Sequence, residues 1–180
     1  MFIDALMEHN PAIQKYGTII QRNPSAPRKR LDFDSSPKPT IPKISFLVYF
    51  IVVDGVVCKI GQSASPESAF TWYVRLSQNM GKGRYIPYYW MYEQVNQGKE
   101  VSFWFECIEE VYVEYPHAIT GAPIQHLAIF GKDREKEYLD FIYSEEGEYP
   151  LLNRQEKMSR ADSFERYYTA MYKEEGGRVA

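Results

Sequence analysis

The chain has 180 residues, of which 44% are hydrophobic and 16% aromatic, enough for one packed domain with an appended segment. Its formal net charge of -3 lacks the basic excess typical of nucleic-acid-binding proteins, although such binding depends on a local patch rather than on the sum. The sequence has no long apolar run and no basic-then-apolar leader pattern, so we expect a cytoplasmic protein without a membrane-spanning helix.

The first 45 residues divide into two parts. Apolar residues from Ile3 to Ile13 favour a short helix within residues 1–20. The stretch 21–43 is rich in proline and serine and has no periodicity, which predicts an arm or linker. Its basic residues leave two interpretations open, a solvated tether or an electrostatic arm for phosphate. They include Arg28, Lys29 and Arg30.

A β-hairpin follows, with Asp54-Gly55 as its two-residue turn. Both faces of the strand 46–53 are apolar, which is typical of a central strand covered on two sides. The return strand carries Lys59 among apolar residues and then Gly61, which we expect to let the chain turn away closely. Antiparallel pairing puts Tyr49 and Lys59 on neighbouring strands with their side chains on the same face.

The remaining elements alternate between helices and one strand. Ser65-Pro66 marks a helix start, and that helix is expected to end near Gln78. The whole pattern predicts an α+β fold, a small, mainly antiparallel three-stranded sheet flanked by helices. The further elements expected are helices at 87–97, 131–143 and 161–174 and a strand at 100–111.

The two cysteines, Cys58 and Cys107, both fall in predicted strands. The chain has no Cys-x-x-Cys and no Cys/His cluster, so we expect two buried reduced thiols and no zinc site.

Two short motifs resemble those of the GIY-YIG nucleases. Leu47-Val48-Tyr49 stands in the first strand and Lys59-Ile60-Gly61 in the second, and their spacing of 10 positions (59 − 49) lies within the family's range. The chain is most similar to the small type II restriction endonucleases of this family, in which a lysine replaces the tyrosine of the second motif. It departs from the family at Leu47, where the first motif has glycine.

The resemblance implies roles for three of these residues. Tyr49 would act as general base, assisted by Lys59, since a nearby ammonium favours the phenolate of a tyrosine. Arg75, on the helix after the hairpin, would hold the scissile phosphate by forked hydrogen bonds. It lies 16 positions (75 − 59) after Lys59, a longer interval than is usual in the restriction members, and Asn79 replaces a His or Tyr common in the family.

The family also needs one glutamate, and two are available, Glu135 and Glu137. Helical spacing puts Glu135 on the face of the following apolar residues, so we favour it as the ligand of one Mg²⁺, with Mn²⁺ as a substitute. Glu137 is the alternative. Asn153 completes a Pro-x-x-Asn that often follows in the family, but its distance from Glu135 is wider than expected. Gly61 and Asn153 are taken as supporting residues.

Basic and aromatic residues are the candidate DNA contacts. Cations would meet phosphates, and aromatic rings would stack on bases or wedge between them. At helical spacing the same aromatic run is more often part of a core. The candidates are Arg28, Lys29, Arg30, Lys82, Arg84, Tyr88 and Trp90.

The expected function is therefore a Mg²⁺-dependent, sequence-specific endonuclease for double-stranded DNA, resembling a type II restriction enzyme. Such enzymes cut palindromes, which favours a homodimer. The expected organisation is an N-terminal helix and arm (1–45), the nuclease-like domain (46–153) and a C-terminal helix (154–180) packed on that domain or on a partner. The alternatives are an inactive DNA-binding module on the same scaffold, a homing or repair nuclease, and an adaptor that binds a partner through its last helix.

Overall fold

The computed structural model describes most of the chain. The described residues are 1–22, 30–34, 46–63, 69, 71, 73–75, 77–108, 111–128, 131–154 and 162–178.

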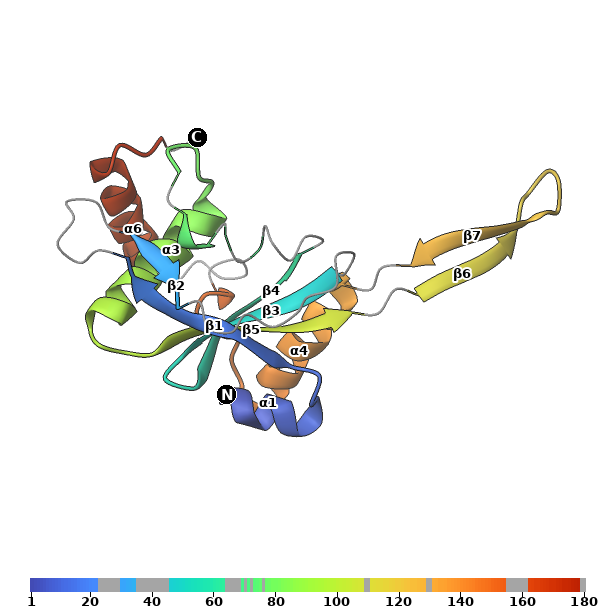
Figure 1. The fold of residues 1–180 in the computed structure, drawn as a ribbon, viewed down its shortest axis with the longest axis horizontal. Helices are drawn as coiled ribbons and strands as arrows, with labels where there is room; N and C mark the ends of the chain where they lie inside the picture. The colour runs from blue at the N-terminus through green and yellow to red at the C-terminus, as the bar shows by residue number, and fades with distance from the viewer. Residues whose placement is uncertain are drawn as a thin grey trace.

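The centre of the fold is a five-stranded antiparallel sheet with the strand order β2-β1-β5-β3-β4 (Figure 1). The predicted α+β class is confirmed, but the expected width of three strands is wrong. The two additional strands, β1 and β2, come from the segment interpreted as helix and arm. The strands are β1 (Gln14–Gln21), β2 (Leu31–Phe33), β3 (Phe46–Val53), β4 (Val56–Ser63) and β5 (Val101–Ile108).

The hairpin β3–β4 forms as its sequence predicts. Asp54 and Gly55 both have positive φ, 48° and 80°, as a two-residue turn that follows strand twist requires. From Leu47 to Val53 every residue of β3 is buried, because β5 and β4 flank the strand and helices cover both faces. β4 extends three residues beyond the predicted end at Ile60, so Gly61 lies inside the strand rather than at a turn.

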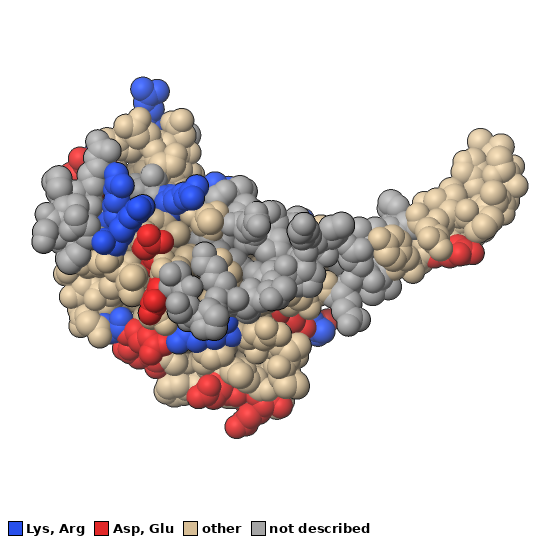
Figure 2. All heavy atoms as spheres, viewed as in Figure 1, with Lys and Arg blue, Asp and Glu red and all other residues tan. Residues whose placement is uncertain are grey.

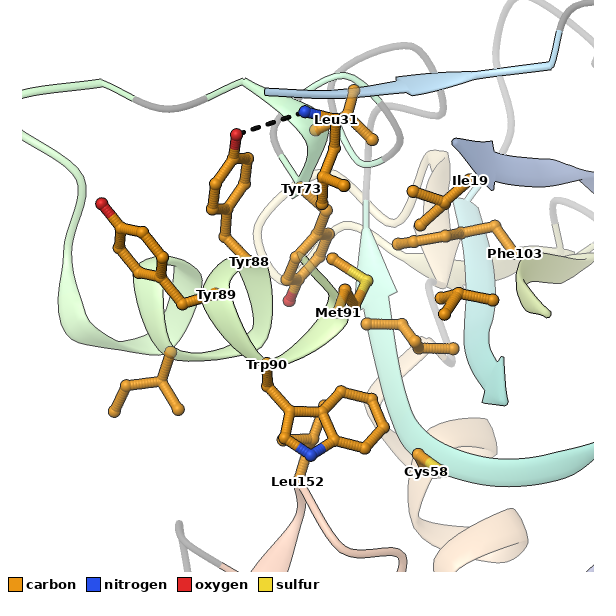
Figure 3. Close-up of a cluster of buried hydrophobic side chains, with 14 of the residues drawn as sticks. Ile19, Leu31, Cys58, Tyr73, Tyr88, Tyr89, Trp90, Met91, Phe103 and Leu152 are labelled. Carbon is orange, nitrogen blue, oxygen red and sulfur yellow. Dashed lines mark hydrogen bonds between the residues drawn. The ribbon is translucent and has the colours of Figure 1, made fainter. Parts of the chain in front are cut away.

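Helices cover the two faces of the sheet, and the sheet separates two apolar cores. One core joins Tyr49, Ile51 and Phe103 to α3 and α6 (Figure 3), and the other joins Val48 and Phe50 to α1 and α4. α3 begins before the residues expected, so Pro87 lies inside it rather than at its start. The described helices are α1 (Ile3–His9), α3 (Lys82–Asn96), α4 (Gly131–Glu146) and α6 (Asp162–Glu174).

A second, two-stranded sheet extends away from the main body as an arm (Figure 1). It consists of β6 (Val111–Pro116) and β7 (Pro123–Ala128), which the sequence interpretation did not anticipate. Of the helix predicted from residue 65, Ala69, Thr71, Tyr73 and Val74 are helical, while Ser65 and Pro66 lie outside the described residues. None of the helices in the described part of the chain has the length and apolar character needed to cross a membrane.

Candidate active site

Tyr49 lies directly over Gly61. The two residues are opposite each other in the β3–β4 register, and both belong to strands whose position the sheet fixes. A Cβ atom built on Gly61 would overlap the hydroxyl oxygen and Cζ of Tyr49. Only glycine therefore leaves room for the tyrosine ring, which explains this residue by close approach and not by a turn.

Lys59 projects from the same face of the sheet as Tyr49. It is opposite Ile51, two pairs along from the Tyr49–Gly61 pair, which makes it a diagonal neighbour of Tyr49 on the same face. The register shifts between Ile51 and Val52, so Cys58 is the extra residue of a β-bulge next to Lys59. Lys59 is only 4% exposed, a rare environment for an ammonium group and one that costs free energy without polar contacts.

A second tyrosine, missed by sequence reasoning, meets Tyr49. The hydroxyls of Tyr49 and Tyr73 form a buried hydrogen bond of 2.6 Å, and their ring centroids are 5.5 Å apart. The exposed fractions are 6% for Tyr49 and 7% for Tyr73, so little solvent reaches either ring. Tyr73 comes two positions before Arg75 on the predicted helix, and nothing in its local pattern distinguished it from a core tyrosine.

Asn153 holds the backbone of β4 at the second motif. Its side-chain oxygen accepts a 2.7 Å hydrogen bond from the Ile60 amide, and its side-chain nitrogen donates one of 2.9 Å to the Ile60 carbonyl. Next to it, the Leu152 amide donates to the Cys58 carbonyl at 2.8 Å. Both polar groups of an edge-strand residue are thus satisfied by one buried amide, which fixes the backbone between Lys59 and Gly61.

The two candidate glutamates occupy different faces of α4. Glu135 is half-buried, one turn after Gly131, whose Cα faces the side chain of Gln62 on β4. Glu137 is exposed and accepts a 2.7 Å hydrogen bond from Arg134. Among the described residues no group of three or more His, Cys, Asp or Glu side chains could hold a metal, so any ion here would have few protein ligands.

Arg75 lines a cavity that does not include the Tyr49–Tyr73 pair. It is exposed and lines a cavity of about 600 Å³ together with Arg22 and Arg30. The lining of that cavity includes neither Tyr49 nor Lys59. The structure therefore brings together Tyr49, Lys59, Gly61 and Asn153. Arg75 lines a separate cavity, and Glu135 lies on α4, which packs on the opposite face of the sheet from Tyr49.

The candidate DNA contacts are distributed unevenly. Arg30 lines the cavity, and Lys82 forms an ion pair with Glu165. Figure 2 shows basic side chains gathered over the end of the molecule that carries β2 and α6, and acidic side chains along the lower edge near α1. Arg84 is exposed. Arg28 and Lys29 lie outside the described residues.

The two aromatic candidates are core residues. Tyr88 has no exposed surface and Trp90 is 6% exposed, and both point from α3 into the cluster shown in Figure 3. The side chains of Tyr88 and Trp90 therefore belong to the core, as helical spacing suggested, and neither ring is accessible to a DNA base in this structure.

The comparisons with known proteins place the fold. No protein-family model matches the chain, and no curated protein matches it. Among solved structures, the chain is similar to an alanine mutant of bacteriophage T4 EndoII, with a TM-score of 0.56 and 10% identity over 78% of this chain and 95% of that one. A weaker likeness joins it to the restriction endonuclease HPY188I in complex with product DNA, with a TM-score of 0.39 and 16% identity over 84% of each chain. At this identity the first match shows a shared fold.

Proposed function

We propose that this chain is a divalent-metal-dependent DNA endonuclease of the GIY-YIG type, with the sequence specificity of a type II restriction enzyme. The observation that carries the proposal is the packing of the Tyr49 ring against Gly61, with Lys59 diagonal to Tyr49. Residues of the two motifs, Leu47-Val48-Tyr49 and Lys59-Ile60-Gly61, are therefore in contact. The fold shared with T4 EndoII supports the proposal. Double-stranded DNA is the proposed substrate and a homodimer the proposed assembly.

Tyr49 is the proposed general base. A free tyrosine has a pKa of about 10 and is a weak base at neutral pH, so it needs a cation nearby. Lys59 is the matching cation, since its ammonium would favour the phenolate. The hydroxyl of Tyr73, 2.6 Å from that of Tyr49, is positioned to share the proton or to pass it to water.

Arg75 is the proposed phosphate ligand. Arg75 is exposed, and only Val74 separates it along the chain from Tyr73 of the tyrosine pair. A fork of N–H donors on a phosphodiester would neutralise charge that builds up as the bond breaks.

Glu135 is the proposed metal ligand. It is a half-buried side chain of α4, and a Mg²⁺ ion that keeps its waters needs only one or two carboxylates in addition to phosphate oxygens. When bound, the ion would neutralise phosphate charge and assist the leaving oxygen. Glu137 fits less well because its carboxylate is exposed and bonded to Arg134.

The test is cleavage of plasmid and mixed genomic DNA with Mg²⁺, with Mn²⁺ and with a chelator. Wild type should give discrete fragments with either ion. Glu135→Ala should lose about 100-fold or more of the rate, as expected for lost metal assistance. Glu137→Ala, two positions away on the same helix, is the matched control and should cut normally. Equal cutting by Glu135→Ala would remove Glu135 from the site, and failure of wild type to cut any DNA would contradict the proposal.

A second function has one observation in its favour. The Tyr49 hydroxyl is buried against Tyr73, and Arg75 lines a separate cavity, an arrangement that also suits a non-catalytic DNA-binding module on this scaffold. This alternative predicts a gel shift that weakens with salt, and no cleavage under any metal condition.

A further inference from the structure

The cavity that contains Arg75 has the size of a small-molecule site. Its volume of about 600 Å³ lies within the range of known ligand pockets. Its described walls come from β1, β2, α3, α6 and the residues that follow α6, and from Thr71, Val74, Arg75, Ser77 and Gln78, so elements distant in sequence build it together. The proposed catalytic chemistry uses only Arg75 among its lining residues.

Three arginines line the cavity, Arg22, Arg30 and Arg75. The Nε atom of Arg22 lies 3.7 Å from a carboxylate oxygen of Asp32, and the backbone amide of Arg22 donates a 3.0 Å hydrogen bond to the Arg30 carbonyl, so residues 22 and 30 meet beside the cavity. Within the described part of the chain, Arg30 and Arg75 form no ion pair. Two guanidinium groups of the cavity lining are therefore available to an anion.

The inner wall is aromatic and held in place. Phe33 contacts Tyr16 edge to face, with centroids 5.1 Å apart, and the Tyr88 hydroxyl accepts a 3.3 Å hydrogen bond from the Leu31 amide. Burial raises the pKa of Tyr88 to about 12, which keeps it neutral. An apolar wall of rings suits a flat heterocycle.

Tyr172 forms a rigid end wall and not a stacking surface. The ring of Tyr85 stacks on the ring of Tyr172, with centroids 4.3 Å apart. Gly177 lies so close to the Tyr172 ring that a Cβ atom built on this glycine would overlap it. The Tyr172 hydroxyl donates to the Gln78 carbonyl at 2.8 Å and lies 3.1 Å from the Ser77 carbonyl. The 77–78 segment of the cavity wall is thereby tied to α6.

Two carboxylates complete the lining, Asp32 and Glu175. They would repel a bare phosphate ion, which carries nothing but acceptors and negative charge at this pH. They would accept hydrogen bonds from amino or hydroxyl groups of a larger ligand. The combination of cations, rings and carboxylates therefore selects a molecule with an anionic end, a flat ring and hydrogen-bond donors.

We propose that this cavity binds one nucleoside monophosphate. The phosphate lies at Arg30 and Arg75, the base lies against Tyr16 and Phe33, and Asp32 or Glu175 accepts from its amino or hydroxyl groups. The ligand is either a free nucleotide or the 5′-terminal unit of a strand. The site goes beyond the nuclease activity and does not need Tyr49 or a metal.

The test is calorimetric titration of the full chain, with a chelator present, with each of the deoxynucleoside 5′-monophosphates, with inorganic phosphate and with 5′-phosphorylated and 5′-hydroxyl single-stranded oligonucleotides. Saturable binding of at least one mononucleotide or of the 5′-phosphorylated strand is expected. Arg30→Ala should weaken it about tenfold or more, the effect of losing one charge-assisted hydrogen bond. Arg30 is exposed, so the variant should fold, which a thermal melt checks.

The control is Arg166→Ala, the same change at an exposed arginine of α6 that does not line the cavity. It should bind like wild type, and so should Tyr49→Phe, which separates this site from the nuclease proposal. Tighter binding of the phosphorylated strand than of mononucleotides would identify a strand end as the source, and the reverse a free nucleotide. Phosphate binding as tightly as any nucleotide, no saturable binding, or normal binding by Arg30→Ala would each overturn the proposal.

Discussion

At the scale of single residues, the contact between Gly61 and the Tyr49 ring decides the geometry of the proposed site. Replacing Gly61 with alanine forces a methyl group into space that the tyrosine hydroxyl and Cζ already occupy. Because the backbone at this point is paired to β3 and held by Asn153, the ring and not the strand must move. We expect Gly61→Ala to lower the free energy of unfolding by about 1–3 kcal/mol, the usual cost of overpacking, and to lose cleavage. Urea unfolding and a DNA cleavage assay measure the two effects.

Gly83→Ala is the matched control for that change. Gly83 lies in the first turn of α3, and nothing lies within 4 Å of a Cβ built on it. Alanine there should leave cleavage unchanged and stabilise the helix by up to about 1 kcal/mol. If Gly61→Ala were as harmless as Gly83→Ala, the ring would not be seated as described.

The sequence predicted the facing of Tyr49 and Lys59 and the need for a glycine at position 61, since the period of two and the turn fix which residues share a face. It misassigned the reason for that glycine, because close approach of a ring depends on a rotamer rather than on a pattern. It missed Tyr73 for a related reason: the hydroxyl contact joins two elements whose crossing angle no local sequence signal determines.

At the scale of secondary structure elements, the fixing of β4 by Asn153 makes the clearest prediction. Asn153→Ala would leave the buried amide and carbonyl of Ile60 without partners, at a cost of about 1–3 kcal/mol for each group. We expect a loss of about 2–5 kcal/mol in urea unfolding. Asn79→Ala, at an exposed turn, should stay within about 0.5 kcal/mol of wild type. Equal stability of the two variants would show that the Asn153 contacts contribute little.

The elements that were predicted correctly are those with strong local signals. The hairpin has apolar strands and an Asp-Gly turn, and α4 and α6 have helical spacing of their inner residues. β1 mixes polar residues with Gly17, and β2 has three residues inside a proline-rich stretch. Their extended state comes from pairing with β5 and from burial of Leu31 and Phe33, which is tertiary information.

The arm of β6 and β7 makes a prediction at the scale of the whole molecule. Its strands pair only with each other in the described structure, and several of its apolar side chains are exposed, including Tyr112 and Ile119. Replacing residues 111–128 with a short Gly-Ser linker should therefore shift the melting temperature by less than about 3 °C, the effect of under 1 kcal/mol in a chain of this size. A larger loss, seen by calorimetry, would mean that the arm stabilises the main sheet.

Burial of protonated groups throughout the core predicts sensitivity to alkali. Desolvation raises the pKa of Cys58 from 9.0 to about 11 and that of Tyr88 from 10.0 to about 12, so the folded state holds these protons after the unfolded chain has released them. The stabilisation is complete below pH 9 and is lost as the pH rises from 9 to 12. In urea unfolding, Tyr88→Phe should lose less stability than wild type between pH 10 and 12. If the unfolding free energies of Tyr88→Phe and wild type fell equally over this pH range, Tyr88 would not contribute to the loss of stability.

The central claim, that Tyr49 performs catalysis in a DNA-cleaving site, is tested most directly by comparing Tyr49→Phe with wild type under single-turnover conditions with Mg²⁺. Phenylalanine keeps the ring over Gly61 and removes only the hydroxyl. Tyr143→Phe, at an exposed tyrosine of α4, is the matched control. The account predicts that Tyr49→Phe loses about 100-fold or more of the cleavage rate, the usual worth of a general base, with unchanged DNA affinity in a gel shift. Cleavage by Tyr49→Phe at the rate of wild type would contradict it.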